Sequence, residues 1–156
     1  MSAHDELKAL LQEDIRQLDM LAELLVREKA VLASPDIQPL QEITPLKNQV
    51  LDGIRDRAKQ KIRVLVGMGY TPAAGEPSRF IRAGGLSELH ELWKEADTKM
   101  RSCQQTNQNN GRVLGHLQKR LTRLTDIFRG ASSQQKLYGA KGQQTSVSGS
   151  SILASA

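Results

Sequence analysis

The chain has 156 residues, enough for one domain, and a formal net charge of +5. It has no apolar run long enough to span a membrane and no charged leader followed by an apolar segment and a cleavage site, and its single cysteine, Cys103, has no disulfide partner. We therefore expect a cytoplasmic protein. Alternating strand-like runs are absent, so we predict an all-α fold: an antiparallel bundle of three to four long helices with coiled-coil character and a flexible C-terminal tail.

The first predicted helix covers residues 3–33. Its leucines recur at every seventh position, and acidic side chains crowd its early turns, where the partial positive charge of a helix start favours them. The repeating leucines are Leu11, Leu18, Leu25 and Leu32. This pattern predicts an amphipathic helix with one face in a core.

The second predicted helix covers residues 36–66, after a break at Ser34-Pro35. Asp36 is its expected cap. Pro45 leaves two alternatives open: the helix kinks there, or it begins there with Thr44 as its cap. The expected apolar face consists of Val50, Leu51, Ile54, Ala58, Ile62 and Leu65. A loop rich in glycine and proline should follow over residues 67–85, held to the bundle by Phe80 and Ile81.

The third predicted helix, residues 86–129, organises the chain. Its apolar residues alternate in steps of three and four, which is a heptad pattern. The core positions are Leu86, Leu89, Trp93, Ala96, Met100, Cys103, Leu114, Leu117, Leu121, Leu124 and Phe128, with Asn107 and Asn110 in the two remaining places. Asn110-Gly111 is a strong turn signal, so a loop over residues 107–111 is the alternative. Because the heptad phase resumes unchanged at Leu114, we predict one continuous helix.

These elements predict a helical domain over residues 1–129 and a tail over residues 130–156. The tail is rich in Gly, Ser, Ala and Gln, and it cannot bury enough apolar surface to offset its ordering entropy alone. Composition favours an unstructured terminus, and the alternative is a segment that becomes ordered on a partner. The basic excess lies on residues 101–129, which hold six basic side chains and one acidic side chain, and on the tail.

No catalytic or metal-binding constellation is apparent in the sequence. His4, His90 and His116 are far apart, and Gly139-Ala140-Lys141-Gly142 lacks the spacing of a phosphate-binding loop. Cys103 fits a small core residue better than a nucleophile. We expect no enzyme activity, no cofactor and no metal, which leaves a helical interaction protein. A basic nucleic-acid-binding bundle or a coiled-coil scaffold is the alternative.

Three features together resemble the FlgN family of flagellar export chaperones. The first is the layout: a Leu-rich acidic helix, a second helix with Lys47 ahead of Leu51, a loop and a long last helix. The second is Asn107-x-x-Asn110-Gly111-Arg112-Val113-Leu114, and the third is Tyr138-Gly139-Ala140-Lys141-Gly142. The chain departs from the family pattern at Lys141, where an acid is usual, and in having Pro39 and Pro45 in the second helix.

The resemblance implies a chaperone that binds the C-terminal helical segments of the two hook–filament junction (hook-associated) proteins. Such a chaperone prevents their premature assembly and delivers them to the flagellar export gate. The resemblance and the apolar stripe together nominate a set of partner-binding residues, with Tyr138 as an anchor at the gate. The set is Asn107, Asn110, Gly111, Arg112, Leu114, Leu117, Leu121, Leu124, Phe128, Leu137, Tyr138 and Gly139.

Overall fold

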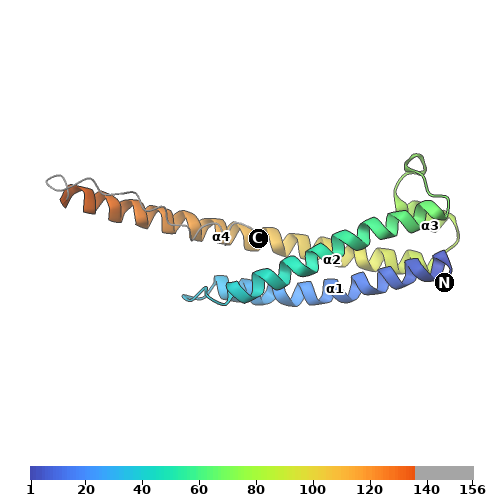
Figure 1. Ribbon diagram of the computed structural model, residues 1–156, viewed down its shortest axis with the longest axis horizontal. Helices are drawn as coiled ribbons and strands as arrows, with labels where there is room; N and C mark the ends of the chain where they lie inside the picture. Colours follow the sequence, from blue (N-terminus) through green and yellow to red (C-terminus); the bar gives the residue numbers. More distant parts are fainter. Residues whose placement is uncertain (136–156) are drawn as a thin grey trace. The chain divides into compact units, whose positions relative to one another are not determined.

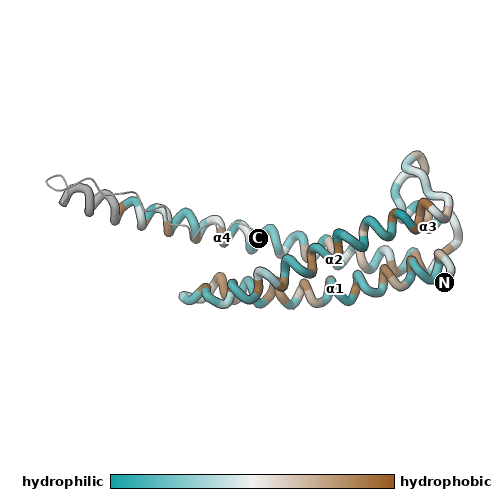
Figure 2. The backbone as a smooth tube through the Cα atoms, in the orientation of Figure 1, coloured by the Kyte–Doolittle hydropathy of each residue, from teal (hydrophilic) through white to brown (hydrophobic). Residues whose placement is uncertain are grey.

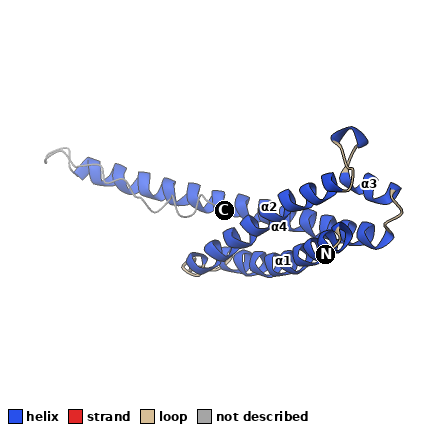
Figure 3. Cartoon of the chain, turned by 45° about the vertical axis from the view of Figure 1, so that its right-hand side comes forward, coloured by secondary structure: helices blue, strands red, loops and turns tan. Residues whose placement is uncertain are grey.

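The computed structural model describes residues 1–135, and their regular secondary structure consists of helices alone (Figure 3). The all-α prediction is therefore confirmed. The chain divides into two units, Met1–Asn107 and Gln108 onward, and each unit is described by itself below.

Two long helices, α1 (Ala3–Leu32) and α2 (Leu40–Gly67), lie side by side and run in opposite directions (Figure 1). Ser2 caps α1, because its hydroxyl accepts a hydrogen bond from the Asp5 backbone N–H at 3.2 Å. The predicted leucine face of α1 is buried from Leu7 to Leu32. Figure 2 shows apolar and polar turns alternating along both helices, as expected for helices with one face in a core.

The structure corrects two expectations about the start of α2: the residue that caps it and the possible start at Pro45. The helix begins at Leu40 with Pro45 inside it, so the alternative start at Pro45 is wrong. Asp36 does not cap the helix: its side chain accepts from the Gln38 backbone N–H at 3.0 Å, and Pro39 is the residue at the N-cap position. Because Pro45 has no N–H, it leaves the carbonyl four residues earlier without its usual helical donor.

The segment predicted as a loop contains two short helical elements. These are the 3₁₀ turn η1 (Pro72–Ala74) and the helix α3 (Pro77–Ala83). Ile81 is fully buried in the core, and Phe80 packs edge-on against Tyr70 with ring centroids 5.5 Å apart. The expectation that Phe80 and Ile81 hold this segment to the bundle is confirmed, whereas α3 itself was not anticipated.

The helix α4 (Ser87–Gln135) runs without interruption through Asn110 and Gly111, which confirms the continuity predicted from the heptad phase. Within the first unit, ion pairs align α4 with α1: Lys8 meets Glu88, and Asp19 meets Lys99, each at 2.6 Å. Because both pairs are offset by the same number of residues in the same direction, these two helices are parallel. The first unit is therefore an up–down–up bundle of α1, α2 and the first part of α4.

The apolar face predicted for α2 is partly wrong. Ala58 and Ile62 are exposed, and the neighbouring Arg57 and Lys61 turn toward the bundle instead. From Leu40 to Ile54 the buried residues of α2 follow steps of three and four, as in a coiled coil. The half-buried Arg57 and Lys61 continue these steps to Val64. The reason is a buried carboxylate on α1, Asp14, which draws the two cations inward.

Alanine substitutions at Gly111 and Gly85 test the backbone conformation at these two positions. A Cβ added at Gly111 or at Gly85 would meet no atom within 4 Å, but Gly85 has a φ of +73° and Gly111 lies in regular helix. Gly111→Ala should therefore stabilise the fold by roughly 0.5–1 kcal/mol, because alanine is the better helix former. Gly85→Ala should destabilise it by about 1–2 kcal/mol. Urea unfolding followed by circular dichroism measures both, and a loss of stability in Gly111→Ala would contradict the helical assignment there.

Candidate functional site

A buried polar cluster joins the three helices of the first unit at one end. The Lys47 ammonium on α2 donates to Glu28 Oε2 on α1 at 2.8 Å and to Asn107 Oδ1 on α4 at 3.1 Å. Lys47 and Glu28 are almost completely buried. Asn107 was predicted as a core-position asparagine, and its structural role is to complete the polar shell of a buried cation.

A second buried ionic cluster lies nearer the other end of the bundle. Asp14 on α1 is paired with Arg57 Nε at 2.6 Å and with Lys61 Nζ at 2.5 Å, both on α2. The Lys61 ammonium also lies 5.0 Å from the centre of the Trp93 ring on α4. Sequence reasoning missed both clusters, although a signal was present: Asp14 and Glu28 continue the three–four spacing of the α1 leucines.

The remaining predicted site residues that the structure describes lie on the second half of α4, in the second unit. Asn110 and Leu114 are buried and Leu117 is half-buried, whereas Leu121 is 58% exposed and Leu124 61% exposed. Gly111 and Arg112 are exposed. Phe128 belongs to α4, but its side chain lies outside the described residues, as do Leu137, Tyr138 and Gly139 entirely.

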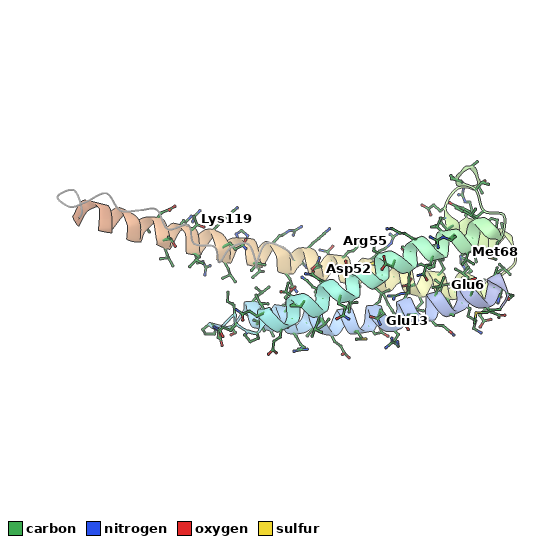
Figure 4. All side chains as sticks on the ribbon, in the orientation of Figure 1. Glu6, Glu13, Asp52, Arg55, Met68 and Lys119 are labelled. Atoms are coloured by element: carbon green, nitrogen blue, oxygen red, sulfur yellow. The ribbon has the colours of Figure 1, made fainter. Side chains whose placement is uncertain are left out.

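The exposed leucines of α4 belong to a wide apolar stripe. Ile127, beside them on the helix surface, is 68% exposed. At 100° per residue, Arg112, Lys119 and Arg123 fall on the opposite side of the same helix. Figure 4 shows Lys119 projecting from α4. Arg120 falls between Leu124 and Ile127, so the apolar stripe also contains one basic residue. The described residues leave Leu121 and Leu124 accessible.

The described residues contain no group of three or more His, Cys, Asp or Glu side chains that could hold a metal ion. No helix among them is both long and apolar enough to cross a membrane. Cys103 is buried, with its sulfur 3.6 Å from the Leu18 carbonyl oxygen, and burial raises the pKa of its thiol. A raised thiol pKa disfavours the nucleophilic thiolate, so Cys103 is a core residue, as predicted.

A helical bundle in the first unit and a helix with an exposed apolar stripe in the second are features typical of all-α proteins that bind other helices. The particular family follows from comparison with known proteins: the family described as FlgN protein matches residues 1–146 of this chain. The chain belongs to the FlgN family, which is a family of flagellar export chaperones. Searches of curated proteins and of solved structures returned no match.

The Lys47 cluster makes a sharp stability prediction. Lys47→Met keeps a similar side-chain length but takes the ammonium away from the buried Glu28, so it should destabilise the fold by about 3–5 kcal/mol. The double variant Lys47→Met/Glu28→Met should recover most of that loss, because it removes both charges. Urea unfolding of the single and double variants measures these differences.

Lys8→Met provides the matched control, since Lys8 forms an exposed pair with Glu88. Its loss should change the unfolding free energy far less than the loss of Lys47, because solvent screens an exposed pair. If Lys47→Met were as mild as Lys8→Met, the buried cluster would not hold the helices together as described.

Proposed function

We propose that this chain binds the C-terminal helical segments of the two hook–filament junction proteins, keeps them from assembling early and delivers them to the flagellar export gate. Membership of an export-chaperone family supports the general role. The observation that carries the finer proposal is the exposed apolar stripe of α4, where Leu121, Leu124 and Ile127 are each more than half exposed. Such a stripe is costly in water unless a partner covers it at least part of the time.

The chemistry of the stripe suggests the kind of partner. Leucines at three–four spacing accept the apolar face of another helix, with anchors spaced at the same intervals. The nominated residues on α4, from Asn110 to Phe128, would form the contact surface. The protein would act in the cytoplasm as a carrier without enzymatic activity, because the described residues assemble no catalytic constellation around this face.

Calorimetry with peptides that cover the C-terminal helical segments of both junction proteins tests the proposal. We expect binding to at least one peptide with little change between low and high salt, because burial of apolar surface is not screened. Leu121→Glu/Leu124→Glu should abolish it. Val26→Glu, at an exposed valine on α1, is the control and should bind normally.

The basic face of α4 offers the contrasting outcome. If the protein bound neither peptide but bound nucleic acid with an affinity that fell steeply with salt, Arg112, Lys119 and Arg123 would carry the function instead. That result would overturn the chaperone proposal in favour of a nucleic-acid-binding bundle.

Tyr138 is proposed as the anchor at the export gate, on the family resemblance of the Tyr138-Gly139 motif. A tyrosine joins an apolar ring to a hydroxyl, which suits a partner's pocket. Tyr138→Ala should leave the melting temperature and peptide binding nearly unchanged while reducing gate binding and filament assembly in cells.

Tyr70 supplies the structural comparison for this variant. Its ring is buried against Phe80, and its hydroxyl donates to the Gly75 carbonyl at 2.8 Å. Tyr70→Ala should lower the melting temperature. A similar drop in Tyr138→Ala would show that Tyr138 is structural and would overturn its docking role.

A further inference from the structure

The first unit contains a groove that the sequence did not predict. It lies between α1 and α2 and has a volume of about 480 Å³. Apolar side chains from both helices line it together with polar and charged ones. Leu24 and Val50 in its lining are buried, whereas Met20 is 43% exposed and Leu46 45% exposed. An amphipathic helix could insert its own apolar residues between the exposed side chains of the groove and reach the buried ones.

The groove contains an arginine with unused hydrogen-bonding capacity. Arg57 donates through Nε to Asp14, but its buried Nη2 has no hydrogen-bond partner. Its guanidinium lies against Gly53: a Cβ at that glycine would be 3.2 Å from Nη1 and 3.7 Å from Nη2. The space that a side chain at Gly53 would fill is therefore occupied by the guanidinium, which lies against the α2 backbone in the groove lining.

The charges around Arg57 do not balance. Asp14 pairs with both Arg57 and Lys61, so among the described residues this ion-paired cluster holds two cations and one anion. Glu13, on α1 (Figure 4), accepts hydrogen bonds from Arg16 and Gln17. These bonds lower the pKa of Glu13 to about 2, and Arg57 makes a smaller contribution. The groove lining also contains one further carboxylate, Glu23, and one further cation, Arg27. The ion-paired cluster of Asp14, Arg57 and Lys61 thus has one more cation than anion, and a further carboxylate would balance it.

We propose that this groove receives one face of an acidic amphipathic helix from a junction protein, and that an aspartate or glutamate of that helix pairs with Arg57. The inference rests on the proposed function and adds a second docking surface to it, distinct from the stripe on α4. The bound helix would place apolar residues against Met20, Leu24, Leu46 and Val50, and one carboxylate beside Arg57.

Charge also argues against a second copy of this chain as the occupant. The exposed apolar stripe that another copy would offer lies on the second half of α4. Residues 108–127 there carry four basic side chains and one acidic side chain. A helix with that excess of positive charge would be repelled by the surplus cation of the cluster around Arg57.

The test uses the full chain and the same two junction-protein peptides in calorimetry. Met20→Glu and Leu46→Glu should each weaken binding about tenfold or more, because they place a charge on the apolar lining of the groove. Ile62→Glu is the matched control: Ile62 is 41% exposed, lies on α2 outside the groove, and should bind like the unmodified chain. All three positions are exposed enough for the variants to fold, which circular dichroism verifies.

A double-mutant cycle then tests the ion pair. Arg57→Gln and the change of each peptide carboxylate to its amide should each weaken binding, and for one peptide residue the two losses should not add. That residue is the partner of Arg57. Fully additive losses at every acidic position would overturn the pairing with Arg57.

The remaining outcomes separate the two proposals. If the unmodified chain binds a peptide and the groove variants bind equally well, the groove inference is wrong and the proposed function stands. If the unmodified chain binds neither peptide, the proposed function fails and the groove inference fails with it. If sedimentation shows self-association that Leu46→Glu abolishes, the groove is a dimer contact and the inference is overturned.

Discussion

The arrangement of the first unit depends on the burial of one ammonium group. A buried charge is expensive to desolvate, so Lys47 is tolerated only where Glu28 and Asn107 both reach it. Leucine heptads alone would permit α1 to slide along α2 by seven residues with little loss of apolar contact. Such a slip would place Leu21 where Glu28 now meets Lys47. The cluster thus contributes to a unique alignment of the helices rather than to raw stability.

The heptad core positions of α4 differ in burial along the helix. Up to Asn107 its core positions are buried or half-buried against α1 and α2, and Leu89, Ala96 and Cys103 belong to the core. At Leu121 and Leu124, equivalent positions are exposed. One helix therefore combines a segment that completes the bundle with a segment that leaves apolar surface accessible, a combination that suits a carrier of other helices.

Much of the fold was accessible from the sequence because periodicity reports on burial. The unbroken phase across Asn110-Gly111 correctly predicted a continuous helix against a strong local turn signal. The helix α3 was missed because its seven residues are too short for periodicity, and it depends on the burial of Ile81. Asp14 and Glu28 were hidden for another reason: acidic residues on a charged helix look solvated until their cationic partners on another helix are known. Ala58 and Ile62 were misplaced for the same reason, since the cations beside them are drawn to Asp14.

The reactivity of Cys103 can report local opening of the bundle. Cys103 is the only cysteine of the chain, and its sulfur is enclosed where α4 meets α1 beside the Leu18 carbonyl. A thiol reagent can reach it only when those two helices separate, and the buried thiol is poorly ionised until they do. The rate of alkylation of the native protein therefore counts openings of the α1–α4 contact without any label being introduced. A carrier that loosens this contact while loading or unloading cargo would reveal that step as a change in labelling rate.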